Sequence, residues 1–203
     1  MNNDLKDEID IFINAIKKSD IYKEYLSILD KVNKSDEIKK IINEIRNIQK
    51  QLVKELKENI PNICLTTDII VGFPNESEED FNDTLSIVEE CKYDSAYTFI
   101  YSKREGTPAS KMEDDIPLSV KEERLQRLNE LVNKYSRESN ERLLNKTVSV
   151  LIDSKSDKEG MLSGYTDTNK LVNVKLDESY IGKIVNVKIT DAKTWSLDGV
   201  LDE

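Results

Sequence analysis

The first 60 residues contain neither glycine nor proline, and their apolar residues recur at helical spacing. Such runs span residues 9–16, 21–32 and 38–56. Ser19 and Ser35 stand just ahead of two runs, where a serine hydroxyl can cap a helix N-terminus. We therefore predict a helical segment over residues 1–59. A segment of about 60 residues builds only a marginal core, so its apolar stripes are expected to be buried by self-association or by another helical protein.

The pattern changes after Pro61, where a β-branched, almost continuously apolar run at 65–71 predicts a strand. A run of this kind suits a parallel strand that is buried on both faces. Ser77 and the acidic residues after it resemble a capping box and should begin a helix that reaches Cys91. A second strand at 95–101 completes a β-α-β unit. Two parallel strands leave two open edges, so we expect a larger sheet, and aggregation through the first strand without it.

A further helix is expected to begin at Ser119, after which the chain returns to short strands. Alternating apolar and polar residues occupy 147–152, 161–166, 171–175, 184–192 and 197–200. Turn residues, mostly glycine and asparagine, separate these strands. Five short strands within one segment predict a small antiparallel β-barrel of the OB-like type, a fold often used to bind nucleic acids.

The composition excludes several kinds of site. The chain has no histidine, which rules out His-dependent triads and most zinc sites. Its two cysteines, Cys64 and Cys91, form neither a CxxC pair nor a disulfide framework, so we expect buried or half-buried thiols in a reducing cytoplasm. The N-terminus is acidic and polar, unlike a secretory signal. No apolar run approaches the roughly 20 residues of a membrane span, and no membrane partner is expected.

The net charge of −10 argues against a general nucleic-acid binder, but the charge is uneven. Acidic and basic residues balance in 1–59. The excess of acid falls mainly in 60–143, and 144–203 is only slightly acidic. An RNA-binding patch in the last segment is therefore compatible with the total.

Several stretches, in the same order, resemble the radical-SAM tRNA methylthiotransferases, and the MiaB type most of all. They are TTDIIVGFPNESEEDF at 66–81, YDSAYTFIYS at 93–102, KEERLQRL at 121–128 and LSGYT at 162–166. The resemblance implies that 60–142 form the C-terminal part of a (β/α) radical-SAM barrel and that 143–203 form a TRAM β-barrel. The expected fold class is thus mixed, with a helical segment, a partial barrel and a small OB-like barrel.

The N-terminal segment resembles a different family, the YlbF/YmcA proteins, which are small, helical and act in complexes. The residues that carry this resemblance are IYKEY at 21–25, SDEI at 35–38 and IRNIQK at 45–50. It implies that 1–59 bind helical proteins of this kind or self-associate.

The methylthiotransferase resemblance also implies a reaction. That family methylthiolates a modified adenosine near the tRNA anticodon, using S-adenosyl-L-methionine and 4Fe–4S clusters held by cysteines. The cluster-ligating cysteines are absent from this chain, so we assign no catalytic residue and no metal ligand. We expect a truncated enzyme that is inactive alone, binds neither cluster and keeps some affinity for the tRNA anticodon stem-loop. The alternative is a helical protein-interaction module that carries the methylthiotransferase fragment as a passenger.

Candidate binding residues follow from the same resemblance. In a complete barrel the cofactor would lie near Gly72, Pro74 and Arg104, whereas in a partial barrel the first two would only turn the chain. The residues that match the RNA-contacting part of the TRAM barrel are Tyr165, Thr166, Asn169, Lys170 and Asn173. Tyr165 can stack on an unpaired base and Lys170 can pair with phosphate, but arginine is usual at both positions, so weaker RNA binding is expected. The single tryptophan, Trp195, could be a stacking platform for a base, but a single tryptophan in a small barrel is more often part of the core.

Overall fold

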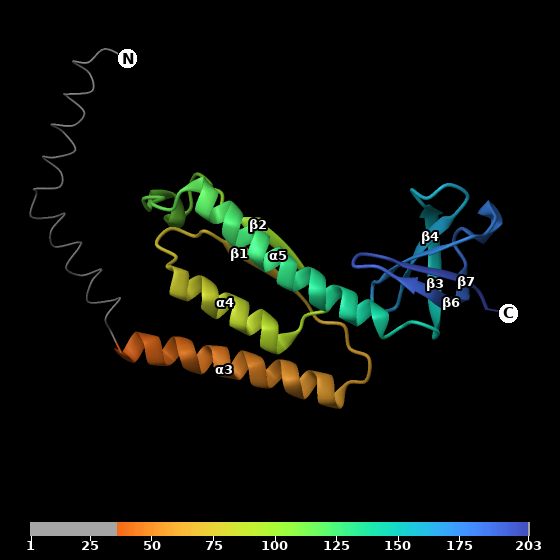
Figure 1. The fold of residues 1–203 in the computed structure, drawn as a ribbon, viewed down its shortest axis with the longest axis horizontal. Coiled ribbons are helices and arrows are strands. Elements are labelled where there is room, and N and C mark those ends of the chain that lie inside the picture. The colour runs from red at the N-terminus through yellow and green to blue at the C-terminus, as the bar shows by residue number, and fades with distance from the viewer. Residues whose placement is uncertain (1–35, 203) are drawn as a thin grey trace, which may run out of the picture. The chain divides into compact units, whose positions relative to one another are not determined.

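The computed structural model describes residues 36–202, and Figure 1 shows their helices and strands. By their contacts, the residues of the chain divide into two compact units, 1–51 and 52–203. The mixed fold class is confirmed, because the described residues form helices, a parallel strand pair and a closed five-stranded barrel. None of the described helices is long and apolar enough to cross a membrane.

Helix α3, Asp36–Asn59, is the described part of the expected helical segment. The runs at 9–16 and 21–32, with the caps Ser19 and Ser35, lie outside the described residues. The apolar residues along α3 are largely exposed: Ile41, Ile42, Ile45, Ile48 and Leu52. The unit boundary falls inside this helix, so its last turns belong to the second unit.

The end of α3 is joined to helix α4, Glu78–Cys91, by a lysine. Lys57 Nζ donates to the backbone oxygens of Cys91 at 2.9 Å and Lys92 at 2.7 Å. These carbonyls lie at the C-terminus of α4, where the helix dipole favours a cation. At the other end of α4, Ser77 and Asp80 form the expected capping box.

Strands β1, Thr66–Val71, and β2, Ser95–Ile100, pair in parallel from Thr66 opposite Ser95 to Val71 opposite Ile100. Helices α4 and α5, Leu118–Glu141, pack against this pair, and Figure 1 shows them beside the strands. Their shared core contains Val71, Phe81, Val88, Ala96, Leu128, Val132 and Tyr135. A short 3₁₀ helix, Pro108–Lys111, lies between β2 and α5.

Two expectations for this region are wrong. The first strand was expected to be buried on both faces, but its residues alternate in burial and Ile70 is 55% exposed. No described strand pairs with the second edge of β1, and the helices cover one face of the pair. Helix α5 begins at Leu118 rather than Ser119, with Pro117 as an N-cap that makes no side-chain hydrogen bond.

The barrel contains all five expected strands: β3 Thr147–Lys155, β4 Leu162–Thr166, β5 Leu171–Val174, β6 Ile184–Ala192 and β7 Leu197–Leu201. They close in the order β3-β4-β5-β7-β6 around an apolar core, and a 3₁₀ turn, Glu178–Tyr180, precedes β6. The barrel is not wholly antiparallel as expected, because β5 pairs with β7 in parallel. Gly164 is required by packing, since a Cβ there would lie 2.1 Å from the Leu151 oxygen.

Candidate functional site

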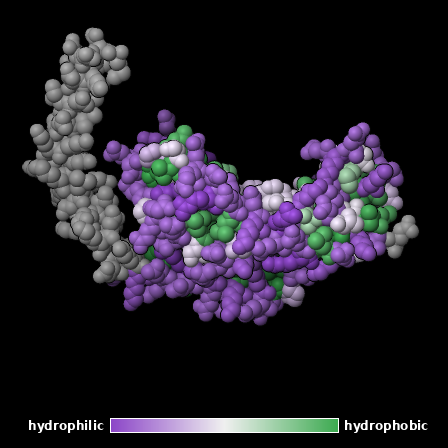
Figure 2. All heavy atoms as spheres, viewed as in Figure 1, coloured by the Kyte–Doolittle hydropathy of each residue, from purple (hydrophilic) through white to green (hydrophobic). Residues whose placement is uncertain are grey.

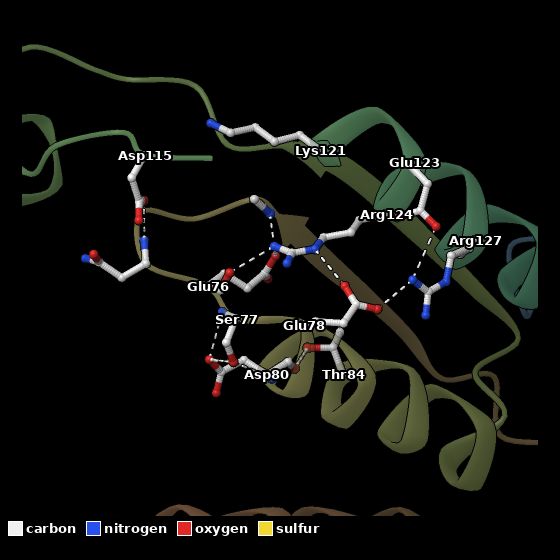
Figure 3. Close-up of polar contacts among 12 residues, drawn as sticks. Glu76, Ser77, Glu78, Asp80, Thr84, Asp115, Lys121, Glu123, Arg124 and Arg127 are labelled. Atoms are coloured by element: carbon white, nitrogen blue, oxygen red, sulfur yellow. Dashed lines mark hydrogen bonds and ion pairs between the residues drawn. The ribbon is translucent and has the colours of Figure 1, made fainter. Parts of the chain in front are cut away.

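The C-terminal ends of β1 and β2 carry a network of paired charges, shown in Figure 3. Gly72 has a φ of +72° and donates its N–H to Glu76 Oε2 at 2.8 Å. Arg124 Nη1 donates to the same carboxylate oxygen at 2.8 Å and to the Glu76 backbone oxygen at 3.0 Å. The Arg124 and Glu76 side chains are 6% and 11% exposed, so they form a buried ion pair that fixes the turn after β1.

Further charges surround this pair and are themselves compensated. Glu78 lies 3.4 Å from Arg124 Nε and accepts from Arg127 at 2.7 Å, and the Arg127 hydrogen bond lowers the pKa of Glu78. Lys121 Nζ donates to Asp114 at 2.6 Å, and a Cβ at Gly72 would lie 2.5 Å from Lys121 Cγ. This end of the sheet is therefore packed and internally neutralised.

The residues expected near a cofactor are placed here, but not as one site. The Gly72 amide already donates to Glu76, Pro74 is buried, and Arg104 is exposed in the turn after β2. No described contact joins Arg104 to the other two. Their cofactor role stays a prediction.

The thiols do not fit an iron–sulfur cluster. Such clusters are held by several cysteine thiolates, and this chain supplies two cysteines. As expected, Cys64 is half-buried and Cys91 is buried. Burial raises the pKa of the Cys64 thiol, which disfavours the ligating thiolate form. Within residues 36–202, no group of three or more Cys, His, Asp or Glu side chains could hold a metal ion.

A polar chain at the N-terminal ends of the strands joins three distant segments. Asp94 is buried and accepts from the Leu65 N–H at 2.9 Å and from the Ser139 hydroxyl of α5. Lys170 of the barrel donates to Ser139 Oγ at 2.9 Å and to Asn140 Oδ1 at 2.8 Å. Burial lowers the pKa of Lys170. Asn140 also donates to the Lys193 oxygen at 2.7 Å, so α5 is bonded to two separate segments of the barrel, at Lys170 and at Lys193.

Two adjoining clefts open on either side of this contact. The basic cleft, of about 890 Å³, is lined by Arg142, Lys146 and Lys170 together with Asp94 and Asp167. The aromatic cleft, of about 720 Å³, is lined by Tyr97, Phe99, Tyr165 and Trp195 and by polar residues of α5. Asp94, Asn169 and Lys170 line both clefts, so one extended ligand could occupy the two together.

The five expected RNA-contacting residues differ in accessibility. Tyr165 is 42% exposed in the aromatic cleft, and Asn169 and Lys170 line both clefts. Thr166 is buried, and its hydroxyl accepts from the Lys170 N–H. Asn173 is buried and donates to Asp198 at 3.1 Å. Direct RNA contact by all five stays a prediction. Thr166 and Asn173 are buried, which suits a structural role.

Trp195 is 58% exposed, so the favoured interpretation as a core residue is wrong, and its alternative role as a stacking platform stays a prediction. Other cleft residues were not anticipated from the sequence. Tyr97 and Phe99 project from the face of β2 that the helices leave open. On α5, the residues that line the aromatic cleft are Asn129, Asn133, Ser136 and Asn140. Their spacing of four, three and four residues is a helical stripe, and that periodicity could have identified them.

Comparison with known proteins finds a matching family for each end of the chain. Residues 141–201 match the TRAM domain, and residues 5–63 match the family described as control of competence regulator ComK, YlbF/YmcA. The tRNA-2-methylthio-N(6)-dimethylallyladenosine synthases of Bacillus cytotoxicus and Bacillus thuringiensis are each 58% identical over 154 residues. That length is 75% of this chain and 30% of each relative. The chain is thus similar to the C-terminal part of a MiaB-type methylthiotransferase with its TRAM domain, preceded by a YlbF/YmcA-like segment.

The YlbF/YmcA match and the methylthiotransferase match overlap in the last turns of α3. A match of 154 residues does not fit after residue 63 of a 203-residue chain, so it overlaps the YlbF/YmcA match. The overlap includes the turns of α3 that belong to the second unit, where Lys57 contacts α4. The expected boundary between 1–59 and 60–142 stays a prediction.

Replacing Arg124 with methionine should destabilise the second unit by about 3–5 kcal/mol, because Glu76 would stay buried without its cation. Arg137, on the same helix, pairs with Glu141 at the surface. Arg137→Met should therefore cost no more than about 1 kcal/mol. Urea unfolding followed by circular dichroism measures both values, and equal costs would contradict the assigned buried pair.

Anaerobic reconstitution with iron and sulfide should leave this chain without a stable cluster, because it lacks the thiolates to hold one. After desalting, iron and acid-labile sulfide should return to background, while the full-length Bacillus thuringiensis synthase treated in parallel provides the positive control. Stoichiometric iron and sulfide with the visible absorption of a cluster would show the assignment to be wrong.

Proposed function

We propose that this chain binds single-stranded RNA, in particular the tRNA anticodon loop, through the basic and aromatic clefts, and that it does not methylthiolate RNA by itself. The observation that carries the proposal is the joining of exposed cations and exposed aromatic side chains around two connected clefts. Single-stranded nucleic acids bind where cations follow the backbone and aromatic rings stack on bases.

The acidity of the chain does not oppose this proposal, because much of it lies away from the clefts. Glu76, Glu78 and Asp114 belong to the paired network at the C-terminal ends of the strands. The basic cleft lies at the N-terminal ends, and six residues of strand separate the two ends by about 20 Å, whereas the aromatic cleft extends along β2 as far as Phe99. That distance exceeds the Debye length of about 8 Å at physiological salt, so these acids are largely screened from phosphates in the basic cleft.

The relatives support RNA as the ligand, and they also indicate why the proposal is limited to binding. Their name states that they act on tRNA, and the TRAM match covers the barrel that forms one side of each cleft. In those enzymes the clusters and S-adenosyl-L-methionine would supply the sulfur and methyl chemistry. The residues of this chain supply only a surface that holds and orients the RNA, since its thiols do not fit a cluster.

A second candidate function is self-association through α3. The exposed isoleucines of α3 lie on a helix within a segment whose acidic and basic residues balance, so two copies would not repel each other. The YlbF/YmcA match covers the same residues. Sedimentation of a dimer that Ile45→Glu dissociates would favour this candidate, and capture of a different helical protein by 1–59 would replace the second copy as the partner.

The affinity for a fluorescein-labelled tRNA anticodon stem-loop should fall as salt rises. The double variant Arg142→Gln with Lys146→Gln should bind more weakly, and its log–log slope against salt should be smaller by about 1.4, or about 0.7 per lost phosphate contact. The matched control is Lys175→Gln with Lys188→Gln, which removes two exposed charges outside both clefts. Absence of binding by the unaltered chain, or an equal change in the control, would contradict the proposal.

A further inference from the structure

We infer that the aromatic cleft is a pocket for one unpaired nucleobase of the bound RNA. This inference rests on the proposed function and adds to it a specific subsite, with aromatic rings that can stack on a base and polar groups that can bond its edge. It concerns which residues contact a base of the bound RNA, rather than whether RNA is bound.

Four exposed aromatic side chains line the cleft, two from the open face of β2 and two from the barrel. Tyr97 and Phe99 stand on β2 and are 64% and 52% exposed, and Trp195 lies in the β6–β7 turn. Tyr165, on β4, lines the cleft on the barrel side. Aromatic rings left open to water around one cavity can gain contact area by stacking on a flat base, and every base has such a face.

A polar stripe of α5 lines the cleft on the face of β2 opposite to Tyr97 and Phe99. Asn129 accepts through Oδ1 from the Thr98 hydroxyl at 2.6 Å, which leaves its amide N–H groups directed elsewhere. Asn133 follows one turn later and is partly buried. Ser136 is 2% exposed, and its hydroxyl has no hydrogen-bond partner. A buried hydroxyl without a partner is rare in folded proteins, so this one marks a position where a ligand could complete the bonding.

The combination favours a base within a nucleic-acid strand over an isolated apolar ligand. Amide groups and a hydroxyl can bond the edge of an unpaired base while aromatic rings hold its face. The adjoining basic cleft places Arg142 and Lys146 where the neighbouring phosphates would run, and it also contains the acidic Asp94 and Asp167. Both carboxylate oxygens of Asp94 already accept hydrogen bonds within the protein, from Leu65 and Ser139.

The single tryptophan makes the pocket directly observable. Titration of the full chain with a single-stranded RNA of about eight nucleotides, within the site size of a small barrel, should quench Trp195 fluorescence. Tyr165→Ala should weaken binding by at least about fivefold, the effect of losing one stacked base, without changing the salt slope. Tyr165→Phe keeps the ring and should restore affinity, and Ser136→Ala should also weaken binding.

Ile184→Ala is the matched surface control, because Ile184 is 71% exposed on the barrel and lines neither cleft. Thermal unfolding by circular dichroism confirms that each variant is folded. RNA binding without tryptophan quenching, or with Tyr165→Ala equal to the unaltered chain, would overturn the pocket while leaving RNA binding through the basic cleft intact. No RNA binding at all would overturn both. Equal quenching by mononucleotides at the same concentration would show a free-nucleotide site and overturn its assignment to RNA.

Discussion

The hydrogen-bonded chain Asp94–Ser139–Lys170 determines the arrangement on which both clefts depend. It joins the turn before β2, the end of α5 and the loop before β5, which lie far apart in the sequence. Burial lowers the pKa of Lys170, but the Ser139 hydroxyl and the Asn140 oxygen accept hydrogen bonds from its Nζ and hold it in this position. Polar groups satisfied in this way within a buried contact rigidify it. The cations and aromatic rings of the clefts therefore face a common space.

The two ends of the strand pair serve different purposes. At the C-terminal ends, the Arg124–Glu76 pair and its neighbours leave little charge for a ligand. From the N-terminal ends along β2 to Phe99, exposed cations and aromatic residues line open clefts. Figure 2 shows a mainly hydrophilic surface with separate apolar patches on the face in view. This contrast supports the proposal that the clefts, rather than the C-terminal ends of the strands, bind RNA.

Local features of the fold could be predicted from the sequence, whereas the environment of individual side chains could not. The β-branched run at β1 and the capping box at Ser77 depend on neighbouring residues, and both were confirmed. Burial of β1 on both faces depends on elements that would cover it, and the structure describes such cover on one face only. Trp195 lies in a short hairpin, where alternation does not distinguish core from surface. The sequence pattern alone indicates that the asparagines of α5 lie on a solvent-exposed face. Only the position of the barrel shows that they line a cleft.

Mapping of ultraviolet crosslinks between the full chain and an anticodon stem-loop would test the central claim most directly. We predict crosslinked peptides that contain Tyr165 and Trp195, with Tyr97 as a further site, since these rings line one cleft. The control region is the C-terminal end of β1, where Phe73 is 42% exposed and so accessible to crosslinking. Crosslinks concentrated at Phe73, or spread over α3 with none in the clefts, would contradict the account.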